Sequence, residues 1–283
     1  MTTYFGSDGA TLHYDELNHA GADRPPVVAL AGGAAMHPRY LGDLAGLGDA
    51  QRLIMPHLRG VGRTPLPESP QTASFWRQAE DVEQLRAHLG LDRVLLLGHS
   101  AGTRLAISYA ARFPDRLAGL VLVTPPAGYL VEEPSDTPAL IDARRGDPVF
   151  DAAVAAWATG PGSHDDPGFN AWYRQVAPLG YAAWGEREQA HASTALYSFA
   201  ANRAYFSVDP PADLAQRLAQ VTAPVLVVAG AQDCSAGLAP VRALSELFPS
   251  AELAVIDQCG HHPWVEQPAA FRTALDTFLH PLS

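Results

Sequence analysis

Residues 93–112 read RVLLLGHSAGTRLAISYAAR and carry the clearest signal of the fold. An apolar run, Arg93–Leu97, leads into the pattern G-x-S-x-G at Gly98–Gly102, and a helix-like stretch, Ala101–Arg112, follows it. This order predicts a strand, a tight turn that carries Ser100, and a helix. In such a turn the serine takes a strained backbone shape and its hydroxyl projects above the sheet. The N-terminus of the helix would direct free N–H groups toward a developing anion.

Apolar runs of strand length recur on both sides of this stretch. They are Val27–Ala31, Arg52–Leu58, Leu117–Val123, Val225–Ala229 and Ala251–Ile256, and an alternating run at Thr11–Leu17 follows a turn at Gly6–Gly9. Helices are predicted at Ser74–Leu89, Leu238–Phe248 and Ala269–Leu279. Runs that are apolar throughout and separated by helices are typical of a parallel sheet covered on both faces, which is an α/β fold.

The strand-length apolar runs do not continue between Gly128 and Ala215. This part is rich in Ala, is interrupted by Pro and Gly, and holds 12 of the chain's 24 aromatic residues. We therefore predict that residues 1–127 and 216–283 form an α/β core. Residues 128–215 are predicted to form a helical cap, or lid, over the carboxyl edge of the sheet.

A serine hydroxyl needs a base to remove its proton, and the base needs an acid to orient it. After a strand–turn–helix of this kind, the acid and the base follow on loops after later strands. Asp233 follows Val225–Ala229, and His261 follows Ala251–Ile256. Because both loops lie at the sheet edge that carries Ser100, we predict a catalytic triad of Ser100, Asp233 and His261.

Other residues compete for these roles. His262 is the rival to His261, which is favoured because the preceding Gly260 lets the backbone approach the site. Weaker candidates for the acid are three aspartates near the last strand and near the exit of the cap, Asp257, Asp209 and Asp213.

Acyl chemistry also needs two donors for the oxyanion. One is expected to be the N–H of Ala101, directly after the nucleophile. The other is expected from the glycine turn after Val27–Ala31, where we favour Gly33 over Gly32.

At these residues the chain resembles the α/β-hydrolase superfamily over essentially its whole length, and within it the proline iminopeptidase-like serine hydrolases. The matching segments are LAGG at 30–33, RGVGR at 59–63, GHSAG at 98–102, the loop of Asp233, and GHHPWVE at 260–266. The resemblance implies an eight-stranded, mostly parallel sheet, a helical cap after the sixth strand, a Ser–His–Asp triad and no cofactor.

The chain departs from that family at two places. Residues 31–35 read AGGAA where the family usually has HGGPG, and His57 stands two residues before Arg59 where the family usually has Asp. Aminopeptidases of the group hold the substrate amine with cap glutamates near a tryptophan. Glu186 and Glu188 lie close to Trp184, although solvated helix charges are the commoner role.

Composition excludes several function classes. The 283 residues carry a net charge of −11, which argues against nucleic acid and anionic membranes as partners. All 19 basic residues are Arg, so chemistry that needs a lysine amine is excluded. Cys234 and Cys259 are too few for a disulfide framework, and no metal-ligand spacing is present. No export signal is visible, so we expect a cytoplasmic protein with a small-molecule substrate; the oligomeric state stays open.

The sequence thus predicts a serine hydrolase that cleaves an ester or amide bond of a small-to-medium apolar substrate through an acyl-enzyme. Two alternatives stay open. The same triad could serve a non-hydrolytic step such as acyl transfer, C–C cleavage, a lyase reaction or cyclisation. The fold could also belong to a ligand receptor without turnover.

Overall fold

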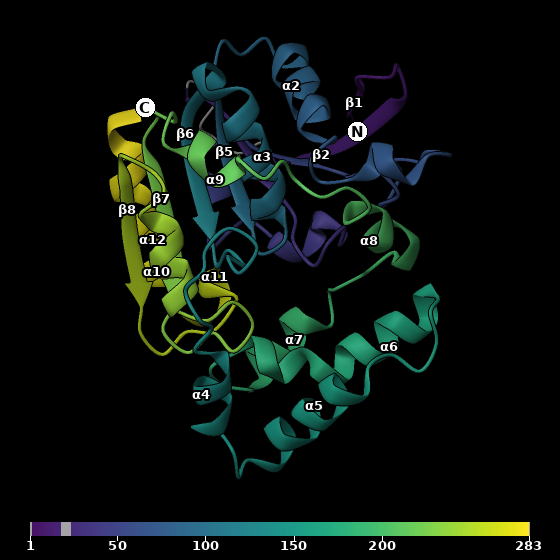
Figure 1. The fold of residues 1–283 in the computed structure, drawn as a ribbon, viewed down its shortest axis with the longest axis vertical. Helices are drawn as coiled ribbons and strands as arrows, with labels where there is room; N and C mark the ends of the chain where they lie inside the picture. Colours follow the sequence, from purple (N-terminus) through teal and green to yellow (C-terminus); the bar gives the residue numbers. More distant parts are fainter. Residues whose placement is uncertain (1, 18–23, 283) are drawn as a thin grey trace.

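A single eight-stranded sheet organises the computed structural model, which describes residues 2–17 and 24–282 (Figure 1). Its strands are β1 (Thr2–Phe5), β2 (Thr11–Leu17), β3 (Val27–Leu30), β4 (Leu53–Pro56), β5 (Val94–His99), β6 (Leu117–Val123), β7 (Val225–Gly230) and β8 (Ala251–Ile256). Their order across the sheet is β1-β2-β4-β3-β5-β6-β7-β8. The pairs β1–β2 and β2–β4 are antiparallel and all the others are parallel, so the predicted α/β fold with a mostly parallel sheet is confirmed.

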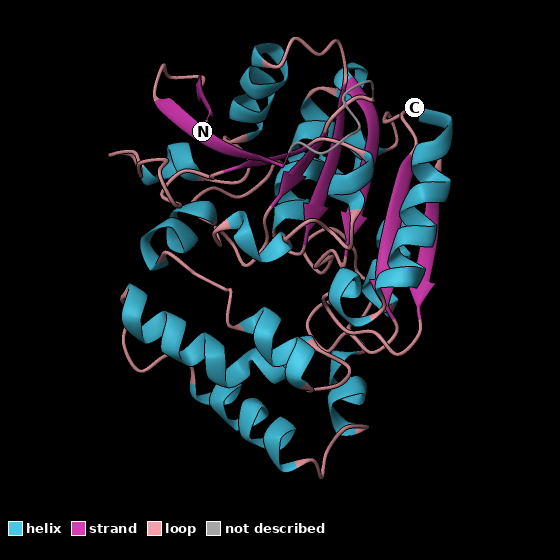
Figure 2. Cartoon of the chain, turned by 180° about the vertical axis from the view of Figure 1, so that it is seen from behind, coloured by secondary structure: helices cyan, strands magenta, loops and turns pink. Residues whose placement is uncertain are grey.

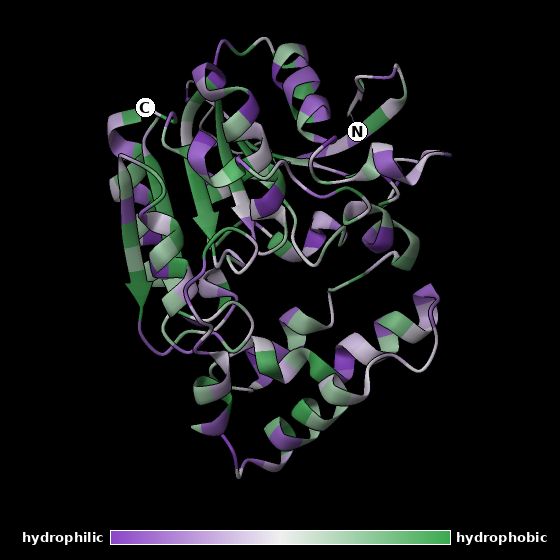
Figure 3. Cartoon of the chain, viewed as in Figure 1, coloured by the Kyte–Doolittle hydropathy of each residue, from purple (hydrophilic) through white to green (hydrophobic). Residues whose placement is uncertain are grey.

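Helices cover both faces of the sheet, as Figure 2 shows. They are α1 (Leu47–Ala50), α2 (Ala79–His88), α3 (Gly102–Arg112), α10 (Ala239–Ser245), α11 (Pro263–Glu266) and α12 (Pro268–Leu279). Side chains of α2, α3 and α10 join one apolar core and those of α1 and α12 join another. In β5, Leu96 belongs to the first core and Leu97 to the second. Strands apolar on both faces, green in Figure 3, therefore fix the sheet between two helical layers.

Between β6 and β7 the chain forms helices and no further strand of the sheet. They are α4 (Thr137–Asp142), α5 (Pro148–Thr159), α6 (Asp166–Val176), α7 (Glu186–Ala192), α8 (Phe199–Tyr205) and α9 (Leu214–Leu218). Figure 1 shows α4 to α7 beyond the arrowheads of the strands, which mark their carboxyl ends. Phe150, Val176 and Leu179 build a small apolar cluster there together with Cys234 of the core. The division of the chain at residues 128 and 215 stays a prediction.

One predicted helix begins later than expected. The spacing of apolar residues predicted a helix over Ser74–Leu89, but α2 begins at Ala79. The Gln78 side chain accepts the N–H of Arg59 and donates to the carbonyl of Ala73, which holds the chain before α2 in turns. Within residues 2–17 and 24–282, no helix has both the length and the apolar character needed to cross a bilayer.

Candidate active site

Ser100 lies on the tight turn between β5 and α3. Its φ of 51° falls in the left-handed region, which is strained for a residue with a side chain. A Cβ at Gly102 would stand 2.5 Å from the carbonyl oxygen of Leu30, and one at Gly98 would stand 2.9 Å from that of Gly102. Both glycines are therefore required for the turn, which leaves the Ser100 side chain half-buried at the carboxyl edge of the sheet.

Asp233 and His261 meet at the same edge. Nδ1 of His261 lies 2.7 Å from Oδ2 of Asp233, and both side chains are buried. The other carboxylate oxygen accepts the backbone N–H groups of Ser235 and Ala236. This arrangement fixes the carboxylate and keeps a proton on Nδ1 of His261, so that Nε2 is left as a base.

The rival residues occupy other positions. The ring of His262 stacks on Tyr181 at a centroid distance of 4.5 Å, and its Nδ1 donates to the carbonyl of Gly180. Burial lowers the pKa of His262 well below its usual range. The competing acids are exposed: Asp257, Asp209 and Asp213.

Ser100 Oγ makes no hydrogen bond to His261 within the described part of the chain. The serine turn and the His261 loop are nevertheless joined by a hydrogen bond, because Nε2 of the His99 side chain lies 2.9 Å from the backbone carbonyl oxygen of His261. Hydrogen bonds between a nucleophile and its base commonly tighten only when substrate binds.

The loop after β3, residues 31–35, runs directly against the serine turn and is called the oxyanion loop below. A Cβ at Gly32 would stand 2.8 Å from Cβ of Ser100. The Gly32 N–H donates to the Tyr40 hydroxyl, so it is engaged. The N–H groups of Gly33 and Ala101 donate no hydrogen bond to any residue that the structure describes, which leaves both free for a substrate oxygen.

Comparisons with known proteins identify the fold of the chain. Residues 25–158 match a family described as the alpha/beta hydrolase fold. The esterase RhEst1 from Rhodococcus sp. ECU1013 superposes with a TM-score of 0.77 at 24% identity, over 100% of this chain and 99% of that chain. The chain has the α/β hydrolase fold.

Two curated relatives match almost the whole chain. The proline iminopeptidase of Clostridium botulinum is 25% identical, over 95% of this chain and 94% of that protein. A Bacillus subtilis protein named "Putative 2-succinyl-6-hydroxy-2,4-cyclohexadiene-1-carboxylate synthase" is 26% identical, over 94% of this chain and 96% of that protein. The resemblance to iminopeptidases thus holds at low identity, beside a relative named for a synthase.

A cavity of about 230 Å³, the His261 cavity, opens beside the His–Asp pair. Its lining is mostly apolar and contains no carboxylate; it comprises Thr137, Ile141, Trp157, Tyr173, Val176, Ala177, Leu179, Gly180, Cys234, Ser235, His261 and His262. Ser100 is not part of the lining. The cavity can therefore hold an uncharged group next to the base.

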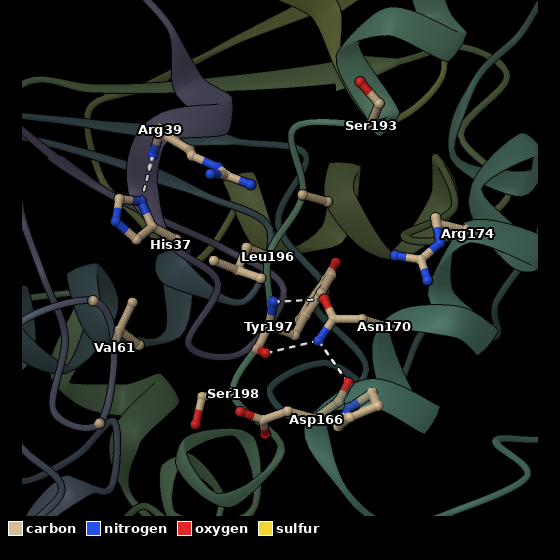
Figure 4. A pocket seen from close by; sticks show the side chains of 14 residues that line it. His37, Arg39, Val61, Asp166, Asn170, Arg174, Ser193, Leu196, Tyr197 and Ser198 are labelled. Atoms are coloured by element: carbon tan, nitrogen blue, oxygen red, sulfur yellow. Dashed lines mark hydrogen bonds between the residues drawn. The ribbon is translucent and has the colours of Figure 1, made fainter.

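A second cavity, of about 650 Å³, is more polar (Figure 4). We call it the Tyr197 cavity. The Asn170 side chain accepts the N–H of Tyr197 and donates to its carbonyl, which fixes this residue in the wall. A Cβ at Gly33 would lie 2.5 Å from Cε1 of Tyr197, so the Tyr197 ring packs on the oxyanion loop. The Tyr173 ring, part of the His261 cavity, lies 4.2 Å from that of Tyr197. Two tyrosines thus separate the cavities.

His57, which departs from the family pattern, lies in a cluster with Asp15 and His37 whose candidate ligand atoms are all within 4.8 Å of one another. Nδ1 of His57 accepts the N–H of Arg63, and Nδ1 of His37 accepts the N–H of Arg39. A metal ion on Nε2 of either ring would require a proton on Nδ1, and so the loss of the hydrogen bond that Nδ1 accepts. The donor chemistry therefore does not fit a metal site.

Three residues of the site were not singled out from the sequence. Tyr40 and His99 connect the oxyanion loop to His261. Glu266 accepts the N–H groups of Ala182, Gly260 and His262, and burial raises its pKa to about 6 despite these bonds. Glu266 belongs to the segment GHHPWVE that resembles the family, which was the available signal. Cys234 and Cys259 are buried free thiols.

Proposed function

We propose that this α/β hydrolase is a serine hydrolase that cleaves an ester of a small-to-medium apolar acyl group through an acyl-enzyme. The contact between His261 and Asp233, on the sheet edge that carries the strained Ser100 turn, supports this proposal most strongly. A buried base held by a carboxylate next to a projecting hydroxyl is the arrangement that activates a serine.

In the proposed mechanism, Nε2 of His261 takes the Ser100 proton while Oγ attacks the substrate carbonyl. The N–H groups of Gly33 and Ala101 stabilise the tetrahedral oxyanion, which they can do because they are not otherwise engaged. His261 then protonates the leaving alcohol. Water, deprotonated by the same nitrogen, releases the acyl group and restores Ser100, while Asp233 stabilises the imidazolium in both halves of the reaction.

The lining of the His261 cavity supports an uncharged substrate. An aminopeptidase needs an anionic group for the substrate amine, and the cavity lining contains none. Glu188 is engaged with the N–H of Gly185 and with Arg187, and Glu186 is exposed. We therefore propose that the bond cleaved is an ester, and not an amide or an N-terminal peptide bond.

The test combines covalent labelling with a substrate panel. A fluorophosphonate probe should label the wild type and fail to label Ser100→Ala, while Ser108→Ala, the substitution of a buried serine of α3, retains labelling. p-Nitrophenyl esters from acetate to octanoate should be hydrolysed, with kcat reduced by roughly 10³-fold or more in Ser100→Ala. If the enzyme prefers amino-acid p-nitroanilides to these esters, it is an aminopeptidase and not an esterase. An unlabelled, inactive wild type would refute the serine mechanism.

A non-hydrolytic reaction is the second candidate, supported by the relative named for a synthase and by the AGGAA sequence of the oxyanion loop. In this case the acyl group would pass to a carbon or oxygen nucleophile other than water. Excess small alcohol in the assay separates the two: transfer gives a new ester as the main product, and hydrolysis gives the free acid.

A further inference from the structure

Three hydrogen bonds run in series from the oxyanion loop to the backbone of His261. The Gly32 N–H lies 2.7 Å from Oη of Tyr40, and that oxygen lies 2.6 Å from Nδ1 of His99. Nε2 of His99 lies 2.9 Å from the carbonyl oxygen of His261. The series connects residues that are far apart in the sequence.

The direction of the series follows from the groups at its ends. A backbone N–H can only donate and a carbonyl can only accept. His99 must therefore carry its proton on Nε2, which donates to His261, and its Nδ1 must accept the Tyr40 O–H. All three bonds then point the same way, and bonds aligned in series polarise and strengthen one another.

The series is closed to solvent. Tyr40 is 2% exposed and His99 is 1% exposed. The rings of His99 and Trp264 pack edge to face, with their centroids 4.7 Å apart. Burial also lowers the pKa of His99 well below its usual range, which keeps the ring neutral and the pattern of donors and acceptors intact. A buried series of this kind is costly to break, because each lost bond leaves an unpaired polar group.

Both ends of the series are parts of the proposed machinery. Gly32 precedes Gly33 and lies against Ser100, and His261 carries the base. We infer that Tyr40 is a positioning residue, which couples the oxyanion loop to the backbone of His261 so that oxyanion donor and base keep their places about Ser100. The catalytic part of this inference rests on the proposed function, and the coupling itself does not.

Tyr40→Phe removes the hydroxyl and keeps the ring. The Gly32 N–H and Nδ1 of His99 lose their partner, but the His261 carbonyl keeps both of its donors, Nε2 of His99 and the Thr124 hydroxyl at 3.1 Å, so the fold should survive. We expect the kcat for p-nitrophenyl esters and the rate constant of fluorophosphonate labelling each to fall about 10-fold, because small misplacements of catalytic groups are costly, while KM changes by less than about twofold. Tyr109→Phe is the matched control: it removes a buried hydroxyl bonded to Glu83, on a part of α3 without contact to the series.

Hydrogen–deuterium exchange measures the coupling without turnover. In Tyr40→Phe, exchange should rise in residues 31–36 and in residues 259–263 together, while Tyr109→Phe leaves both segments at the wild-type rate. His99→Gln is a second variant, since it loses the ring that joins the two ends, and it should loosen the same two segments.

The outcomes separate the two proposals. If the wild type resists the fluorophosphonate probe but Tyr40→Phe loosens both segments, the coupling stands and the serine mechanism fails. If the probe labels the wild type and Tyr40→Phe keeps wild-type kcat, labelling and exchange, the inference is wrong. A loss of activity that Tyr109→Phe shares to the same extent would also overturn it, because it would report stability alone.

Discussion

Nδ1 of His261 and Oδ2 of Asp233 face each other across 2.7 Å in a contact that is nearly closed to water. The second oxygen of Asp233 is occupied by two backbone N–H groups. The carboxylate is therefore held in one orientation, and the imidazole in one tautomer. This relationship determines which nitrogen of His261 is available as the base.

Asp233→Asn tests that dependence. The amide keeps one oxygen for the backbone N–H groups and turns its NH₂ toward His261, which would move the ring proton to Nε2. We expect kcat to fall by about 10⁴-fold with little loss of stability. Steady-state kinetics and the melting temperature check this, with the exposed Asp257→Asn as control. Activity within tenfold of the wild type would show that Asp233 is not the acid.

Gly33→Ala tests the oxyanion loop. Gly33 has a φ of 66°, so a side chain costs about 1 kcal/mol of stability, and its Cβ would lie 2.5 Å from the Tyr197 ring. Displacement of the Gly33 N–H should reduce kcat by about 10²-fold. Gly9→Ala is a matched control, because Gly9 also has a positive φ, 79°, but its Cβ would meet nothing within 4 Å. Equal kcat values for the two variants would contradict the role of Gly33.

Glu266 predicts a dependence of stability on pH. Burial raises its pKa from 4.5 to about 6, against the lowering effect of three backbone N–H groups. A carboxyl whose pKa is higher in the folded state binds its proton more tightly there. Its contribution to stability is therefore present below about pH 4.5 and is lost as the pH rises through 6.

The measurement compares Glu266→Gln with the wild type in denaturant unfolding between pH 4.5 and 7. The wild type should lose about 2 kcal/mol more of its free energy of unfolding than the variant across this range. Glu252→Gln, which changes an exposed carboxylate of β8, should follow the wild type. Parallel pH curves for the wild type and Glu266→Gln would mean that Glu266 does not titrate in this way.

Ile141→Trp tests whether the His261 cavity holds the acyl group. The tryptophan ring is larger than the isoleucine side chain and should occupy part of the 230 Å³ of the cavity. We therefore expect kcat/KM for octanoate esters to fall by about tenfold relative to acetate esters. Leu196→Trp places the same ring in the Tyr197 cavity and should leave the chain-length profile unchanged. The reverse pattern would assign the acyl group to the Tyr197 cavity.

The sheet and its edge were predictable because their signals are local. Leu117–Val123 and Ala251–Ile256 are strands with the bounds that their apolar runs predicted. Asp233 and His261 could be paired because the carboxyl ends of parallel strands meet at one edge. The start of α2 could not be predicted, since the contacts of Gln78 with Arg59 and Ala73 override the apolar periodicity.

The hydrogen-bond series through Tyr40 and His99 could not be predicted from the local sequence pattern. Tyr40 and His99 are 59 positions apart, and His99 and His261 are 162 apart. An aromatic residue after a glycine turn and a histidine before a serine each look ordinary alone. Their meaning comes from tertiary packing, and the same is true of Tyr197, which reaches Gly33 from a segment without strand periodicity.

β6 and β7 are neighbours in the sheet, with Val123 opposite Val228, and the helices α4 to α9 are strung between them. Because the chain leaves the sheet at β6 and returns to it at the adjacent strand β7, this stretch can be replaced without a change in the order of the strands. Its length and composition can drift over generations while the register of the β-ladder stays as it is. Substrate specificity can therefore change during evolution while the sheet stays the same. Exchange of this stretch between relatives is the corresponding way to engineer specificity.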